Sequence, residues 1–275
     1  MQPTTTAPET MPHGKVTYAV TNGVALITLT NPPANGYSYE MMRDLDEAVL
    51  RARFDAAVHV LVIAGAGEKF FCAGADISML DAVTPTFKYA FCLHANETML
   101  RLEHTPKLVI AALNGHCVGG GLEIALACDL RVARKGSGKC GLPEVALGVL
   151  PGTGGTQRLA RMVGRSRAIE LMTTGRTFDF DEAERLGLVD KQLEVADDAT
   201  FLAAVLEYAG TFCPPHRASL AVGLIKRAVT SGMEVPLESG LALERELQQR
   251  LFTSEDAKEG INAYATKRKA EFQGR

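Results

Sequence analysis

Two glutamates lie in stretches of the sequence where a charged side chain is unusual. Glu123 follows three consecutive glycines, Gly119–Gly121, and precedes an apolar run, while Glu144 lies in a second apolar segment, Cys140–Gly155, that is rich in proline and glycine. A carboxylate is rarely buried without a partner. Each glutamate taken alone is more often a helix cap or an ion-pair partner, but two carboxylates at one site form an acid–base pair. The two are the first candidates for proton-transfer chemistry.

Two glycine-containing turns, each preceded by a short apolar run, are the candidates for a site of negative charge. They are "KFFCAGADISML", Lys69–Leu80, and "NGHCVGGGLEIALACDL", Asn114–Leu130. Small residues leave peptide N–H groups accessible near the start of a helix, where negative charge is favoured. For a single turn, capping or tight packing is the commoner explanation. Two N–H groups, one from each turn, would form an oxyanion hole.

A third glycine-rich turn, "PGTGG" at Pro151–Gly155, has no matching nucleotide-binding pattern. It lacks a full G-x-G-x-x-G, and no acidic residue follows at the spacing of a dinucleotide site. The chain also has no G-x-S-x-G elbow for a serine nucleophile. We therefore expect neither a dinucleotide or P-loop site nor a serine hydrolase.

Bulk composition excludes several other classes of function. The chain has 275 residues, a formal net charge of −3 and six cysteines, none in a C-x-x-C pair. This charge argues against nucleic-acid binding, and the cysteines are expected to be reduced and buried, with no metal site. No stretch is long enough for a membrane span. We expect a disordered tail at residues 1–14, with neither a secretory signal nor a transit peptide, and a cytoplasmic protein.

The elements that must position these residues follow an α/β pattern. "KVTYAVTNGVALITLT" predicts a hairpin turning at Asn22-Gly23. Short apolar runs, among them "HVLVIAG", "KLVIAALNG" and "DLRVAR", predict strands covered on both faces, separated by helical segments. From about Asp197 the chain continues as amphipathic helices without strands, whose apolar faces need covering by the core or by another subunit.

Four segments in this order resemble the crotonase superfamily, and most closely enoyl-CoA hydratase. The likeness extends from about Lys15 to Arg275, and the ordered set is highly specific. Two of the segments carry the glycine turns, the third carries Glu144 and the fourth is the C-terminal helix. They read FFCAGADISML, NGHCVGGGLEIALACDLRVA, GLPEVALGVLPGTGGTQRLARMVG and FTSEDAKEGINAYATKRKAEFQGR.

The resemblance implies a spiral of stacked ββα turns over residues 15–196 and a helical trimerisation region over 197–275. It implies trimers, which can pair into hexamers, and an acyl-CoA thioester as substrate with no separate cofactor. By motif match, Ala75 and Gly120 are the oxyanion-hole donors and Glu123 and Glu144 the catalytic glutamates, Glu123 mainly activating water and Glu144 mainly transferring the α-proton. Substrate contacts are expected at Ala73, Asp76, Ile77, Pro143, Gly152 and Lys267, the last often reaching a neighbouring subunit's CoA.

One departure from the family pattern lies at Asn35-Gly36-Tyr37, which no Lys or Arg precedes in "NPPANGYSYEMM". This stretch therefore offers no basic side chain to the CoA phosphates, and Tyr37 either alters the pocket or is a packed aromatic. The segment after Asp76, residues 77–100, is expected to set acyl specificity. The leading hypothesis is a 2-enoyl-CoA hydratase, a hydro-lyase of fatty-acid β-oxidation. A Δ3-Δ2-enoyl-CoA isomerase, another CoA-thioester lyase and a non-catalytic acyl-CoA-binding protein are the alternatives.

Overall fold

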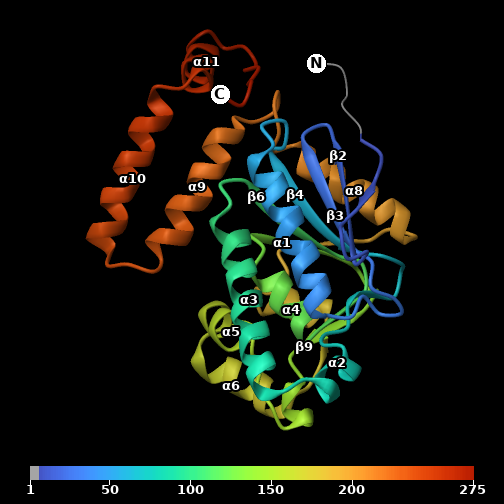
Figure 1. Cartoon of the computed structure of the whole chain (residues 1–275). Coiled ribbons are helices and arrows are strands. Elements are labelled where there is room, and N and C mark those ends of the chain that lie inside the picture. The colour runs from blue at the N-terminus through green and yellow to red at the C-terminus, as the bar shows by residue number, and fades with distance from the viewer. Residues whose placement is uncertain (1–5) are drawn as a thin grey trace.

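The structure, a computed structural model, describes residues 6–275 as an α/β core from which three C-terminal helices project (Figure 1). The larger sheet has the order β1-β2-β3-β4-β6-β8-β11, with β1, β2 and β3 antiparallel and every later pairing parallel. Its strands are β1 (Glu9–Thr10), β2 (Val16–Thr21), β3 (Val24–Leu29), β4 (Val60–Gly65), β6 (Leu108–Leu113), β8 (Leu130–Arg134) and β11 (Lys191–Leu193).

A smaller four-stranded sheet holds the segments that carry the glycine turns. Its order is β10-β9-β7-β5, in which β5, β7 and β9 are parallel and β10 is antiparallel. The strands are β5 (Phe70–Cys72), β7 (His116–Val118), β9 (Lys139–Gly141) and β10 (Phe178–Asp179). Each of the parallel strands therefore ends at the same edge of this sheet.

The predicted hairpin and the predicted buried strands are confirmed. Asn22 and Gly23 both have positive φ, 51° and 83°, as a two-residue hairpin turn requires. In β4, Leu61 and Ile63 belong to one core cluster while Val60 and Val62 belong to another on the opposite face. Since both faces of the strand are covered, its sequence is apolar throughout rather than alternating.

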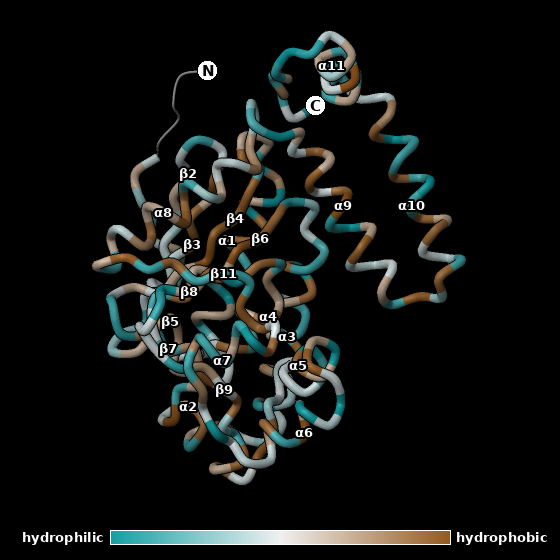
Figure 2. The backbone as a smooth tube through the Cα atoms, turned by 180° about the vertical axis from the view of Figure 1, so that it is seen from behind, coloured by the Kyte–Doolittle hydropathy of each residue, from teal (hydrophilic) through white to brown (hydrophobic). Residues whose placement is uncertain are grey.

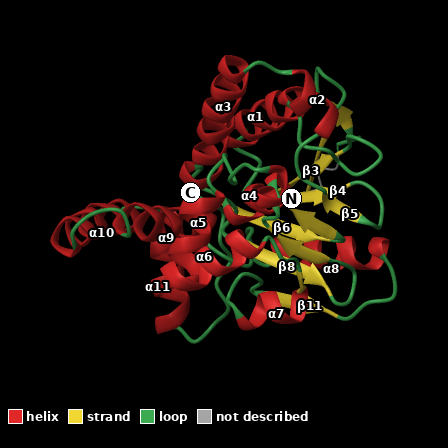
Figure 3. Cartoon of the chain, turned by 90° about the horizontal axis from the view of Figure 1, so that it is seen from below, coloured by secondary structure: helices red, strands yellow, loops and turns green. Residues whose placement is uncertain are grey.

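Helices cover the two faces of the larger sheet, as Figure 3 shows from below. Helix α1 (Tyr39–Phe54) packs on β2 and β3 and against α3 (Pro85–His104), and α8 (Asp198–Gly210) packs on β3, β4, β6 and β8. The Ser38 hydroxyl caps α1 by accepting from Met41 N at 3.2 Å. The remaining elements of the core are α2 (Ile77–Ala82), α4 (Gly120–Leu126), the 3₁₀ helix η1 (Glu144–Leu147), α5 (Gly155–Val163), α6 (Arg165–Thr174) and α7 (Phe180–Arg185).

The expected disordered tail at residues 1–14 is wrong for its described part. Glu9 and Thr10 pair with Thr17 and Tyr18 of β2, and Met11 is buried in the main core. The polar composition suggested disorder, but burial of Met11 and backbone pairing with the open edge of the sheet hold this segment in an ordered conformation. Residues 1–5 lie outside the described part of the chain.

The projecting part of the molecule consists of α9 (Ser219–Gly232), α10 (Leu237–Phe252) and α11 (Glu255–Ala265), whereas α8 stays on the sheet. Lys226 of α9 ties this part to the core, because its Nζ lies 2.8 Å from Asp129 Oδ2 and also donates to the carbonyl of Leu102. Figure 2 shows hydrophobic residues in β4 and β6, as expected for a core, and also along α9. No helix in residues 6–275 is long and apolar enough to cross a membrane.

Candidate active site

The two glycine turns lie side by side, because the strands that precede them are parallel neighbours. Cys72 at the end of β5 pairs with Cys117 of β7. Gly74 and Gly119 both have positive φ, 91° and 54°. A Cβ on Gly74 would lie 2.9 Å from the carbonyl oxygen of Val118, so these backbones approach as closely as only glycine permits.

The N–H groups of Ala75 and Gly120 are both free for a ligand. Tyr37 forms a parallel bridge with Ala75 in which Tyr37 N donates to Gly74 O (2.7 Å) and Asp76 N donates to Tyr37 O (3.0 Å). This bridge uses the peptides on either side of Ala75 and leaves its own N–H unused. Gly120 begins α4, and its N–H is one of the donors that a helix start leaves free. Within residues 6–275 neither N–H has an acceptor.

Glu123 is buried, with 3% of its surface exposed, and the "PGTGG" turn holds its carboxylate. Oε1 accepts from Thr153 N and Gly155 N, both at 2.8 Å, and Oε2 accepts from the Thr153 hydroxyl. A Cβ on Gly155 would lie only 3.1 Å from Oε1. The sequence pattern of this turn did not predict that Thr153 and Gly155 support Glu123. The available signal was a third turn of small residues with no nucleotide-binding pattern.

Glu144 opens η1 directly after Pro143 and reaches the start of α4. Its Oε1 lies 2.9 Å from where a Cβ on Gly119 would be, and its Oε2 is buried with no hydrogen-bond partner in the described chain. Burial raises the pKa of Glu144 to about 7; the Glu123 carboxylate adds to the rise, and the Lys88 ammonium opposes it. The Glu144 carboxylate therefore lies beside the start of α4, the helix that carries Glu123, and the two carboxylates interact electrostatically.

The other predicted contact residues differ in their surroundings. Ala73 N donates to Ala34 O at 3.0 Å, next to the Tyr37 bridge. The Asp76 carboxylate caps α2 by accepting a hydrogen bond from Ser78 N at 2.9 Å, so this side chain stabilises the helix start. The side chain of Ile77 is 58% exposed.

The segment predicted to set acyl specificity lies against the site through α3. A Cβ on Gly152 would lie 3.4 Å from Cys92 Sγ. The Nζ of Lys88, one turn earlier in α3, lies 5.1 Å from the centroid of the Phe91 ring. Its positive charge lowers the pKa of Glu144. Helix α3 therefore contributes a thiol, an ammonium group and an aromatic ring to the surroundings of the glutamate pair.

Lys267 is the predicted contact that the structure does not bring to this site. It follows α11, which lies at the opposite end of the molecule from α2 in Figure 1. The Lys267 N–H donates to Tyr264 O, and no hydrogen bond or ion pair in the described chain joins Lys267 to Glu123, Glu144 or either glycine turn.

The sequence and the fold of this chain match those of one protein family. The family model described as enoyl-CoA hydratase/isomerase matches residues 19–275. The chain belongs to this family, in the crotonase superfamily, and its core of parallel-sheet ββα units with a C-terminal helical region has the crotonase fold.

Individual relatives extend over nearly the whole chain. The short-chain-enoyl-CoA hydratase of Clostridium acetobutylicum is 38% identical over 249 residues, which cover 90% of this chain and 93% of that protein. The crotonyl-CoA hydratase of Syntrophomonas wolfei is 37% identical over 250 residues, covering 90% and 94%. The crystal structure of an enoyl-CoA hydratase from Geobacillus kaustophilus HTA426 has a TM-score of 0.92 at 42% identity and covers all of both chains. These likenesses support an enzyme of the hydratase/crotonase type acting on a CoA thioester.

Proposed function

We propose that this chain is an enoyl-CoA hydratase, a hydro-lyase that adds water across the 2,3 double bond of a 2-enoyl-CoA. The observation that carries the proposal is that the Glu144 carboxylate lies beside Gly119, next to the free N–H of Gly120, while Glu123 lies one turn further along α4. Coenzyme A is part of the substrate, and the reaction needs no separate cofactor. A role in fatty-acid β-oxidation and a place in the cytoplasm belong to the same proposal.

The two N–H donors act on the thioester oxygen. When water attacks the β-carbon, negative charge moves to that oxygen and an enolate forms. Donors already aimed at the oxygen stabilise this charge without reorganising, and losing one typically costs about 3–4 kcal/mol of barrier height. Ala75 and Gly120 come from different turns, so their relative position is set by the pairing of β5 with β7.

The two glutamates differ in the proton that each handles. A carboxylate accepts about four hydrogen bonds, and three protein donors already bind Glu123, two at Oε1 and one at Oε2. The remaining lone pair, on Oε2, can accept a hydrogen bond from a water. Glu123 takes the proton of the attacking water. Glu144, with a pKa of about 7, is protonated in a large fraction of molecules at neutral pH and delivers its proton to the α-carbon.

Hydration of crotonyl-CoA by the purified protein, followed with Glu123→Gln and Glu144→Gln, tests this proposal. Each variant is expected to lower kcat by about 10²–10⁴-fold, the typical contribution of a positioned acid or base. Glu234→Gln is the matched control, because Glu234 is ion-paired with Arg161 on the surface and its substitution should leave kcat unchanged. Full activity of either site variant would remove that glutamate from the mechanism, and tight acyl-CoA binding with no turnover at any chain length would favour a non-catalytic binding protein.

A Δ3-Δ2-enoyl-CoA isomerase is the second candidate, and the environment of Glu144 is what favours it. A single carboxyl group with a pKa near neutrality can take a proton from one carbon and return it to another. Glu123 would then be dispensable. Turnover of a 3-enoyl-CoA much faster than that of the 2-enoyl-CoA of equal length, retained in Glu123→Gln, would select the isomerase.

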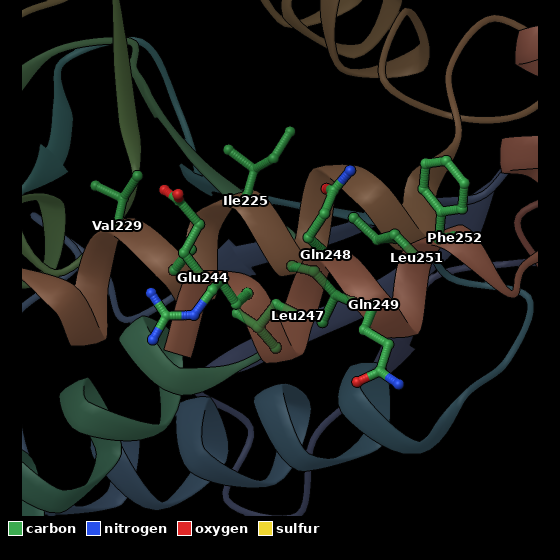
Figure 4. A pocket seen from close by; sticks show the side chains of 11 residues that line it. Ile225, Val229, Glu244, Leu247, Gln248, Gln249, Leu251 and Phe252 are labelled. Carbon is green, nitrogen blue, oxygen red and sulfur yellow. The ribbon is translucent and has the colours of Figure 1, made fainter. Parts of the chain in front are cut away.

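We also propose that the chain forms a homo-oligomer, a trimer or a pair of trimers, through its projecting helices. A groove of about 730 Å³ runs between α9 and α10, lined by Ile225, Val229, Leu247, Leu251 and Phe252 among others (Figure 4). Ile225, Val229 and Phe252 are more than half exposed in the single chain. Such an apolar face is suited to a second copy, and assembly would give Lys267 a neighbouring acyl-CoA to contact.

A further inference from the structure

Tyr37 is a buried aromatic residue at the centre of the site to which the hydration chemistry assigns no task. It is 2% exposed, and its ring meets that of Phe91 edge-on with centroids 5.4 Å apart. A Cβ on Gly120 would lie 2.8 Å from Tyr37 Cγ. The ring therefore supports the peptide that carries one of the two oxyanion donors.

The hydroxyl of Tyr37 is an unsatisfied donor close to Glu123. Its Oη is buried and forms no hydrogen bond of standard geometry within residues 6–275. Burial and the Glu123 carboxylate raise the pKa of Tyr37 well above its usual value, while the nearby Thr153 side chain lowers it. The phenol thus stays protonated at neutral pH, next to the threonine that holds Glu123.

Packing alone does not explain this hydroxyl. The large majority of buried side-chain polar atoms in proteins are hydrogen-bonded, and an unpaired buried donor is costly. A phenylalanine would fill the same space without that cost. The Tyr37 hydroxyl and the Thr153 side chain interact, since Thr153 lowers the pKa of Tyr37. In free enzymes catalytic hydrogen bonds are often long or poorly aligned and tighten only when the substrate binds.

Thr153 determines the direction of such a bond. Its single hydroxyl proton is donated to Glu123 Oε2, which leaves the threonine oxygen as an acceptor only. Because Tyr37 stays protonated, its hydroxyl can donate a hydrogen bond to this threonine oxygen. Successive donors in a chain polarise and strengthen one another in a site of low dielectric constant.

We propose that Tyr37 is a positioning residue, whose hydroxyl donates to the Thr153 hydroxyl and so holds Glu123 oriented toward the attacking water. Tyr37 touches neither the water nor the reacting carbons in this scheme, and it acts through Thr153. The inference rests on the proposed hydratase function for its kinetic consequences. The hydrogen-bond chain itself does not depend on which reaction the site performs.

The kinetic test uses Tyr37→Phe, which keeps the ring and removes only the hydroxyl. We expect kcat for crotonyl-CoA to fall by about 3–10-fold with KM within twofold, the size of effect of one neutral hydrogen bond. In a Thr153→Val background the same substitution should have no further effect, because the chain is already broken. Tyr18→Phe is the matched control, since Tyr18 is a second buried phenol with an unpaired hydroxyl, packed under Arg51 away from the site.

Hydrogen exchange of the Thr153 and Gly155 amides, measured by NMR on the full chain, gives a readout independent of turnover. Both amides donate to Glu123, so Tyr37→Phe should speed their exchange by about 3–10-fold while Tyr18→Phe leaves it unchanged. Unchanged exchange in Tyr37→Phe, or loss of kcat that adds fully to that of Thr153→Val, would overturn the role of Tyr37. A wild-type protein that hydrates no 2-enoyl-CoA would instead overturn the proposed function, and the exchange result would still decide for or against Tyr37.

Discussion

Glu144 and Glu123 differ in how their carboxyl oxygens are satisfied. Three protein donors hold Glu123, whereas Glu144 keeps a buried oxygen with no partner. Burial raises the pKa of Glu144 to about 7, so the folded chain binds this proton more tightly than the unfolded chain, whose glutamates titrate near pH 4.3. The stabilisation from Glu144 is therefore complete below about pH 4 and is lost as the pH rises to 7.

This linkage predicts that Glu144→Gln gains stability while it loses activity. At pH 8 the wild-type protein must bury a charge that glutamine lacks, so the variant should be more stable by on the order of 1–2 kcal/mol, discounted for the partial exposure of the group. The melting temperature in a thermal scan should rise by about 2–5 °C at pH 8. The difference should vanish toward pH 4, where both side chains are neutral; an equal gain at both pH values would contradict the raised pKa.

At the scale of elements, the start of α4 depends on the absence of a side chain at residue 120. The helix begins where β7 ends, beside the turn that follows β5, and Tyr37 lies directly under its first residue. A Cβ on Gly120 would meet the Tyr37 ring at 2.8 Å, closer than such atoms approach in proteins. The helix start would have to move, and the oxyanion donor would move with it.

Gly120→Ala is accordingly expected to lower kcat by about 10²–10³-fold, as loss of one oxyanion donor does, and to change KM much less. Overpacking should also cost about 1–3 kcal/mol of unfolding free energy, measured by urea denaturation. Gly210→Ala in α8 is the control, because a Cβ there meets nothing within 4 Å. Wild-type kcat in Gly120→Ala would show that this peptide does not face the thioester oxygen.

At the scale of the whole molecule, α9 and α10 expose an apolar groove that the single chain does not cover. If a second copy covers it, charges introduced there should be buried without partners and the assembly should dissociate. We expect the double variant Ile225→Glu, Val229→Glu to sediment as a monomer in analytical ultracentrifugation, whereas the wild type sediments as a trimer or hexamer. Phe54→Glu, at the end of α1 where the side chain is even more exposed, should leave the assembly intact. A monomeric wild type, or a double variant that keeps the wild-type mass, would contradict this interface.

The local pattern of the sequence by itself determined most of the elements and the chemical nature of the candidate site. The hairpin at Asn22-Gly23, the helix after Ser38 and the apolar strand β4 follow from turn chemistry, capping and periodicity, which act between residues close in the chain. The glycine turns and the two glutamates were recognisable as single motifs for the same reason. The buried place of Met11 and the strand β1 were not, because an open sheet edge is formed by strands elsewhere in the chain.

Only the tertiary structure decided which of these residues meet. Glu123 and Glu144 are 21 positions apart, and no local rule fixes the approach of η1 to the start of α4. The parallel pairing of β5 with β7 places Ala75 beside Gly120, and the turn at Thr153 and Gly155 holds Glu123. Such contacts depend on how whole elements pack. Residue types therefore indicated the proposed acid–base site and oxyanion hole, and long-range packing determined how these residues and the buried hydroxyl of Tyr37 are arranged.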